Sequence, residues 1–277
     1  MYLFNKKLLA ILIGIFVYNV AGYGQKIDST FHIYVLMGQS NMAGRGEITP
    51  ELEKCNNENV FMLDSNNHWV RAQHPVHFDK PKVAGVGPGL SFGITMAEAN
   101  PSIRIGLVPC AVGGTSIEKW RPDAFDKATQ THPYDDAVVR TKEAMKYGII
   151  KGIIWHQGES DSSEEKAKKY LEQLSELIQR MRDLVGNPNL PFIAGELGDF
   201  KPQYQDINST LKYLPEKIKC TAVVGSEGLV DKGDKTHFDG PSANELGIRF
   251  AKKMQELQLF QISIDEHTHN YINSITK

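Results

Sequence analysis

Short, almost continuously apolar runs separated by longer amphipathic segments restrict what this 277-residue chain can fold into more than any other feature. The runs cover residues 33–37, 60–63, 103–108, 149–155, 192–195 and 221–225. Apolar residues at successive rather than alternate positions are typical of parallel strands that are buried on both faces of a sheet. We therefore expect these runs to pair as one parallel sheet.

Segments with apolar residues at helical spacing lie between the runs. They cover residues 90–99, 135–146, 162–184, 206–214 and 242–257. Along the third of them, residues such as Tyr170, Leu174 and Leu177 recur on one side, as in an amphipathic helix. The alternation of strand and helix predicts an α/β fold with helices on both faces of the sheet.

The first 24 residues have the layout of a secretory signal peptide. Lys6 and Lys7 precede an apolar run over residues 8–20, and the small residues Ala21 and Gly22 follow it. An uncleaved membrane anchor is the alternative, although a spanning helix needs roughly 20 apolar residues. We expect a secreted or periplasmic protein with one domain over residues 25–260 and a C-terminal tail over 261–277, without stable membrane association once the leader is cleaved.

Charge and cysteine content exclude several other classes. The formal net charge of −2 gives no reason to expect nucleic acid or an anionic membrane as a partner. Cys55, Cys110 and Cys220 are too few and too scattered for a disulfide framework or a zinc site. The histidines show no ligand spacing either, so we expect no metal and no cofactor.

Two of the segments that follow predicted strands combine glycine with residues suited to acyl transfer. After the run 33–37, Gly38 precedes Ser40, which fits a nucleophile on a turn or simply an N-cap serine. After the run 103–108, Gly113 and Gly114 fit an ordinary turn or a loop whose N–H groups face an anion. Active sites of doubly wound sheets collect beyond the carboxyl ends of the strands, so both segments are candidates.

The segment after the fourth run is unusually polar. It places His156, Gln157 and Glu159 in one turn. Gln157 can donate to a developing oxyanion, and Glu159 can hold an Arg or a His. Asp161 or the serine before it can alternatively cap the long helix that follows.

The last polar segment carries the spacing Asp234-x-x-His237. This spacing lets a carboxylate meet Nδ1 of a histidine in the same turn. The Nε2 atom is then left to accept a proton from a serine. The motif is a weak signal alone and gains weight as the last of four polar strand-end segments.

Together, and in this order, these segments resemble the sequence blocks of the SGNH hydrolases. More narrowly, they resemble carbohydrate esterase family six, the acetylxylan esterase and sialate O-acetylesterase-like group. The matching phrases are Gly-Gln-Ser-Asn-Met at 38–42, Gly-Gly-Thr-Ser-Ile at 113–117, His-Gln-Gly-Glu at 156–159 and Asp234-x-x-His237. The resemblance spans residues 33–251 and implies a flavodoxin-like three-layer α/β/α fold with a central parallel sheet.

The resemblance also implies the roles of single residues. Ser40 is the implied nucleophile and His237 the implied base, oriented by Asp234 or, as in some members, by Glu159. The resemblance also implies which groups donate to the oxyanion and which residues contact the substrate. The donors are the N–H of Ser40, an N–H of Gly113 or Gly114 and the Gln157 amide, which replaces the asparagine usual in SGNH hydrolases; the contact candidates are Asn41, Arg45, Trp120 and His156.

For Trp120, a ring stacked on a sugar and a ring packed under its loop are equally open alternatives. The expected function is a secreted serine esterase that removes acetyl groups from acetylated carbohydrate. Acetylxylan is the substrate that we expect. The alternatives are a sialate O-acetylesterase, a lipase-like hydrolase and a non-catalytic carbohydrate-binding protein on the same fold. The sequence makes no prediction of the oligomeric state.

Overall fold

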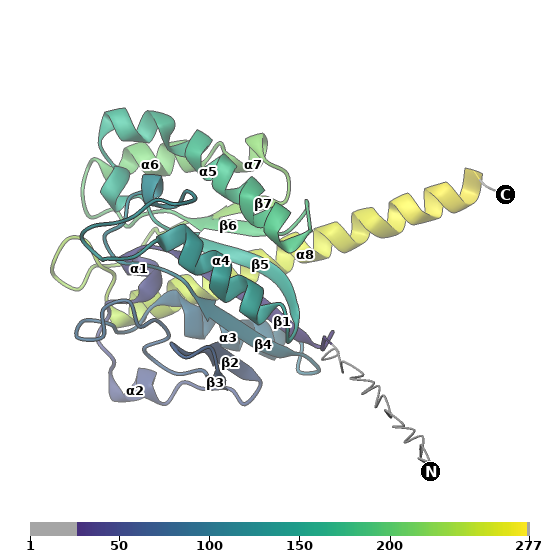
Figure 1. Ribbon diagram of the computed structural model, residues 1–277, viewed down its shortest axis with the longest axis horizontal. Coiled ribbons are helices and arrows are strands. Elements are labelled where there is room, and N and C mark those ends of the chain that lie inside the picture. Colours follow the sequence, from purple (N-terminus) through teal and green to yellow (C-terminus); the bar gives the residue numbers. More distant parts are fainter. Residues whose placement is uncertain (1–26, 276–277) are drawn as a thin grey trace, which may run out of the picture.

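A seven-stranded sheet forms the middle of the computed structural model, which describes residues 27–275, with side chains to residue 263 (Figure 1). The predicted signal peptide lies outside the described residues. In spatial order the strands are β3 (Trp69–Arg71), β2 (Val60–Leu63), β4 (Arg104–Pro109), β1 (Phe31–Gly38), β5 (Ile149–His156), β6 (Phe192–Gly195) and β7 (Thr221–Val224). All neighbouring strands are parallel except β2 and β3. The chain thus has the mixed α/β fold and the mostly parallel sheet that the apolar runs predict.

Strand β3 is the element of the sheet that the sequence pattern does not predict. It pairs antiparallel with β2 at the edge of the sheet, with Trp69 opposite Leu63 and Arg71 opposite Phe61. The strand is three residues long and includes Arg71, so it carries no continuous apolar run. β3 is extended because its backbone pairs with the open edge of β2. Its conformation thus comes from a tertiary contact and not from its own sequence.

The predicted helical segments are helices in the structure, with shifted ends. The helices are α1 (Ser40–Ala43), α2 (Pro50–Glu53), α3 (Pro88–Ala99), α4 (Pro133–Ala144), α5 (Glu164–Val185), α6 (Tyr204–Leu211), α7 (Leu214–Lys217) and α8 (Gly240–Ile275). The short helices α2 and α7 were not predicted, whereas a helix that begins near Ser40, as α1 does, was among the alternatives. Among the described residues, no helix is both long enough and apolar enough to cross a membrane.

Helix α8 runs past residue 260, where the sequence predicts that the domain ends and a tail begins. Its backbone continues without a break from Gly240 to Ile275, and its last turns extend past the sheet (Figure 1). No glycine or proline follows Gly247 within the helix, so no residue in that stretch interrupts the backbone hydrogen bonds. Residues 261–275 of the expected tail are therefore helical and continuous with α8.

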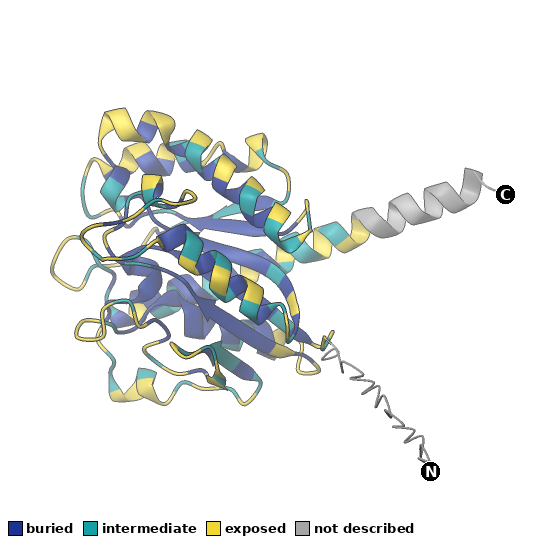
Figure 2. Cartoon of the chain, in the orientation of Figure 1, coloured by how far each residue is buried: buried dark blue, intermediate teal, exposed yellow. Residues whose placement is uncertain are grey.

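Alternate residues of β1 face two separate cores, which explains why residues 33–37 are apolar at successive positions. Ile33 and Val35 belong to the core that α4, α5 and α6 close, whereas Tyr34 and Leu36 belong to the core that α1, α3 and α8 close. Figure 2 shows the strands buried along most of their length between these helices. The helices on the two faces and the sheet between them form three layers.

The chain reverses its direction of travel across the sheet at β1, which lies between β4 and β5. In doubly wound sheets, ligands bind beyond the carboxyl ends of the strands at this point of reversal. The loops that follow β1, β4, β5 and β7 all leave the sheet at that edge. These loops carry the four polar segments singled out in the sequence.

Arg140 on α4 ties two strand ends together near this edge. Its guanidinium donates to the backbone oxygen of Pro109 at 2.9 Å, of Leu63 at 2.6 Å and of Asp64 at 3.1 Å. The ring of Phe78 lies 4.8 Å from the guanidinium carbon. One side chain thereby satisfies carbonyl groups at the ends of both β2 and β4.

We predict that Arg140→Met destabilises the fold by ~2–4 kcal/mol, because carbonyl groups of the buried strand ends at Leu63 and Pro109 lose their donors. Urea unfolding followed by circular dichroism measures the change. Lys142→Met on the same helix is the matched control, because Lys142 is exposed, and it should change stability by less than ~0.5 kcal/mol. Equal effects of the two variants would contradict the role of Arg140.

Candidate active site

Ser40 stands at the start of α1, directly beyond the end of β1. Gly38 has a φ of 132°, and a Cβ atom there would lie 2.1 Å from the backbone oxygen of His156. Glycine is therefore required for β1 to end this close to β5 and turn sharply. The turn leaves Ser40 6% exposed, with its hydroxyl beside the loop that follows β7.

His237 and Asp234 meet Ser40 from that loop. The Nε2 atom of His237 lies 3.0 Å from Oγ of Ser40, and its Nδ1 lies 2.7 Å from Oδ2 of Asp234. Burial opposes ionisation of Asp234, but the N–H groups of His237 and Thr236 and the His237 ring outweigh it and lower the pKa of Asp234 to about 2. The carboxylate is thus charged and aligned with the imidazole.

Glu159 points elsewhere, although it stands near the same pocket. Its Oε1 accepts from Nδ2 of Asn41 at 2.5 Å and lies 4.0 Å from Nδ1 of His156. Asp234 is the carboxylate on His237 in this geometry, whereas the sequence left Asp234 and Glu159 as alternatives.

Two backbone N–H groups are free to face a developing oxyanion. Among the described residues, neither the N–H of Ser40 nor that of Gly114 donates to an acceptor. Gly114 lines the pocket in a left-handed conformation, with a φ of 88°. The expectation for Gly113 needs correction, because its N–H donates to Oδ2 of Asp79 at 2.8 Å.

The Asp79 carboxylate is a buried support for the Gly113 loop. It pairs with Arg45 at 2.6 Å, and both side chains are 4% exposed. Burial raises the cost of the charge, but the hydrogen bond and charge of Arg45 prevail and lower the pKa of Asp79. Lys80 donates to the backbone oxygen of Gly113 at 2.9 Å. Arg45, expected to bond sugar hydroxyls, lines the pocket with its guanidinium engaged by Asp79.

Gln157 does not face the pocket, which corrects its expected place in the oxyanion hole. Its side chain is fully buried, and its Nε2 lies 2.6 Å from Oδ2 of Asp161, 3.1 Å from Oε1 of Gln39 and 3.2 Å from the oxygen of Thr115. An amide nitrogen has two N–H groups, so these acceptors occupy it completely. Gln157 instead joins the loops that follow β1, β4 and β5.

Three of the expected substrate contacts are buried and therefore corrected. Trp120 is fully buried, packs edge-on against Trp155 at 5.1 Å and donates to Thr115 at 3.3 Å. His156 is also fully buried, with its Nε2 3.0 Å from the oxygen of Glu196, and desolvation lowers its pKa. Asn41 is 3% exposed. These side chains contact other residues of the protein and do not line the pocket as substrate contacts.

The candidate pocket has a volume of about 520 Å³ and is lined by Ser40 and His237 together with three lysines. The lysines are Lys80, Lys201 and Lys232. Sequence reasoning missed Lys201 and Lys232, because each is a single basic residue in a loop with no motif around it. Lys80 and its neighbour Asp79 lie in a segment that is similar to the family pattern, and this likeness is the sequence signal that could have found them.

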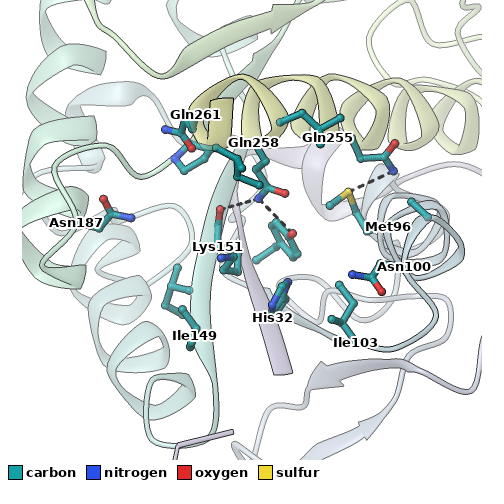
Figure 3. A pocket seen from close by; sticks show the side chains of 16 residues that line it. His32, Met96, Asn100, Ile103, Ile149, Lys151, Asn187, Gln255, Gln258 and Gln261 are labelled. Carbon is teal, nitrogen blue, oxygen red and sulfur yellow. Dashed lines mark hydrogen bonds between the residues drawn. The ribbon is translucent and has the colours of Figure 1, made fainter. Parts of the chain in front are cut away.

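A second hollow lies at the opposite end of the sheet (Figure 3). It lies between α8, which contributes Gln255 and Gln258, and the amino ends of β1 and β5, which contribute His32 and Lys151. Gln258 donates to the backbone oxygen of Lys151 at 3.0 Å. None of the candidate catalytic residues lines this hollow, so the catalytic chemistry belongs to the other edge.

Comparison with known proteins defines the class. The family model described as carbohydrate esterase, sialic acid-specific acetylesterase, matches residues 30–256. The Arabidopsis thaliana protein called probable carbohydrate esterase is 32% identical over 240 residues, which are 79% of this chain and 88% of the plant protein. The chain therefore belongs to this carbohydrate esterase family.

Solved structures agree with that membership. The crystal structure of the Arabidopsis protein superposes with a TM-score of 0.73 and covers 81% of this chain and 98% of the plant chain. A carbohydrate acetylesterase from Xanthomonas citri has the same fold, with a TM-score of 0.61 at 19% identity, covering 79% of this chain and 55% of that chain.

We predict that Trp120→Ala lowers stability by ~3–5 kcal/mol, because it empties a buried aromatic site. Turnover of acetylated polysaccharide and of p-nitrophenyl acetate should fall by the same factor, since the ring supports the loop and touches no sugar. Urea unfolding and the two assays, made well below the unfolding temperature, check this. A loss confined to the polysaccharide would restore Trp120 as a sugar contact.

For the triad acid, Asp234→Asn should lower kcat by roughly 10³-fold or more, because the wrong histidine tautomer is then favoured. Glu159→Gln should be much less damaging. Since the pKa of Asp234 is about 2, its carboxylate stays charged above that value, so the difference should persist between about pH 5 and 8. If Glu159→Gln is the more damaging variant, the two roles are exchanged.

Proposed function

We propose that this chain is a secreted serine carbohydrate O-acetylesterase of the SGNH hydrolase type, related to carbohydrate esterase family six and built on a flavodoxin-like three-layer α/β/α fold. The observation that carries the proposal is the chain of contacts from Ser40 through His237 to Asp234 at the carboxyl edge of the sheet. Family membership supports the reaction, and the signal peptide-like leader supports export.

In the first half-reaction, Oγ of Ser40 attacks the acetyl carbonyl carbon while Nε2 of His237 takes the hydroxyl proton. The carbonyl electrons move to oxygen, where the N–H groups of Ser40 and Gly114 stabilise the charge. Each well-placed donor of this kind contributes ~3 kcal/mol. His237 then gives its proton to the sugar oxygen, the bond from the acetyl carbon to that oxygen breaks, and acetyl-Ser40 remains.

In the second half-reaction, water replaces the sugar. His237 takes a proton from water, whose oxygen attacks the acetyl carbon of acetyl-Ser40. The same N–H groups face the second oxyanion. Acetate leaves when the ester bond to Oγ breaks, and His237 returns the proton to Ser40. Asp234 holds the ring and stabilises its charged form throughout.

The first substrate proposed is acetylated polysaccharide, with acetylxylan as its leading example. A specific observation supports a second candidate, an acetylated sugar that carries a carboxylate, such as an O-acetyl sialic acid. Lys80, Lys201 and Lys232 line the pocket, whereas the charge of Arg45 is matched by Asp79. Lys232 lies 3.8 Å from the carboxylate of Asp234, whereas Lys80 and Lys201 pair with no carboxylate among the described residues. Ammonium groups without a paired carboxylate around a cleft attract an anionic substrate.

We predict that Ser40→Ala lowers acetate release from the best substrate by more than about 10³-fold and leaves the circular dichroism spectrum unchanged. A panel of acetylated xylan, acetylated pectin and O-acetyl sialoglycan identifies that substrate. A variant that retains a tenth of the wild-type rate would remove Ser40 as the nucleophile.

A separate prediction concerns Lys201 and Lys232 of the pocket. The double variant Lys201→Gln, Lys232→Gln should raise KM for an O-acetyl sialic acid by about tenfold, because two charges are lost from the rim. KM for acetylated xylo-oligosaccharides should change by less than about twofold. Lys252→Gln, at an exposed position of α8, serves as the control. Equal shifts for acidic and neutral sugars would remove the second candidate.

A further inference from the structure

The loop that carries His237 needs an external support to hold its position relative to Ser40. Residues 232–235 of this loop are exposed. The contact from Asp234 to His237 lies within the loop itself, so it orients the imidazole without fixing the loop to the rest of the protein. The distance between Oγ of Ser40 and Nε2 of His237 therefore depends on contacts between the loop and the body of the protein.

Asn41 supplies two such contacts from the residue next to Ser40. Its Nδ2 donates to the backbone oxygen of Thr236 at 2.9 Å, and its Oδ1 accepts from the N–H of Phe238 at 3.1 Å. These groups belong to the residues immediately before and after His237. One carboxamide thus holds the backbone on both sides of the histidine.

Glu159 determines which way this carboxamide faces. Its Oε1 accepts the other hydrogen of Nδ2 of Asn41 at 2.5 Å, and its side chain is 5% exposed. Rotating the amide by half a turn would place Oδ1 of Asn41 against both the carboxylate and the oxygen of Thr236. That arrangement would leave three acceptor oxygens facing one another without a donor, which is costly.

We propose that Asn41, oriented by Glu159, is a positioning residue that sets the distance from nucleophile to base. Asn41 is next to Ser40 in α1 and is bonded on both sides of His237, so it links the two reacting groups by a path much shorter than the chain between them. The proposal rests on the proposed serine esterase function. It gives Glu159 a role that needs an acceptor oxygen and no proton transfer.

The test compares Asn41→Ala with Asn208→Ala, assayed on p-nitrophenyl acetate at a temperature where both are folded. Asn208 is a matched control, because it is 5% exposed and also bonds a loop backbone twice, at the N–H and the oxygen of Leu197 (2.8 and 2.9 Å). Misplacement by about 1 Å costs on the order of 10²-fold in rate. Asn41→Ala should therefore lower kcat by about 10²-fold with KM within about threefold, and Asn208→Ala should change kcat by less than about threefold.

Glu159 provides the second comparison. Glu159→Gln keeps an acceptor oxygen and should retain at least about a third of kcat, whereas Glu159→Ala should lose about tenfold or more. Similar losses in both variants would show that the charge of Glu159, rather than its hydrogen bond to Asn41, is what matters. That result would overturn the proposal.

Amide hydrogen exchange gives a readout that does not depend on turnover. The N–H of Phe238 donates to Asn41, so its exchange should accelerate in Asn41→Ala and stay unchanged in Asn208→Ala. Unchanged exchange, or faster exchange with wild-type kcat, would overturn the positioning role. If the wild-type chain shows no turnover that depends on Ser40, the proposed function is wrong. The positioning role of Asn41 is then wrong as well, even if hydrogen exchange confirms its contact with Phe238.

Discussion

The parallel pairing of β1 with β5 is the constraint on which the site depends. Gly38 and His156 are partners at the carboxyl ends of the two strands, and the N–H of Gln39 donates to the oxygen of His156 at 2.9 Å. This approach is possible because residue 38 has no Cβ. The segments that carry Ser40 and Glu159 therefore leave the sheet side by side. The loop after β7 then brings His237 within hydrogen-bond distance of Ser40.

Beneath the pocket, polar groups are buried at a cost that their mutual hydrogen bonds offset in part. Desolvation raises the pKa of Asp161, while its bonds from the N–H of Ile117 and from Gln157 oppose that rise. A substitution in this network would leave a buried group without a partner. The strand-end loops are therefore supported by one another as well as by the strands, and a rigid edge is what an enzyme needs to hold reacting groups in register.

Charges near the pocket fall into two groups that differ in burial. Arg45 and Asp79 are almost wholly buried and bonded to each other, so they shape the loop around Gly113. Lys232, by contrast, is exposed and lies 3.8 Å from Asp234. The buried pair contributes geometry, whereas exposed lysines contribute an attractive field that salt screens.

The sequence by itself determined the class of fold and the segments that form the site. Runs that are almost continuously apolar reveal strands buried on both faces, and Asp234-x-x-His237 is a spacing that works within one turn. Both are local patterns. The short β3 was missed because it is extended only in the presence of β2.

Only the tertiary structure decided which polar side chains line the candidate pocket. Trp120, His156 and Gln157 have the chemistry of substrate or oxyanion contacts, yet all three are fully buried. Asn41 finds its partners 195 to 197 positions along the chain. Burial and hydrogen bonds between residues far apart in sequence depend on how helices and loops pack around the sheet. That packing is a property of the whole chain rather than of any one segment.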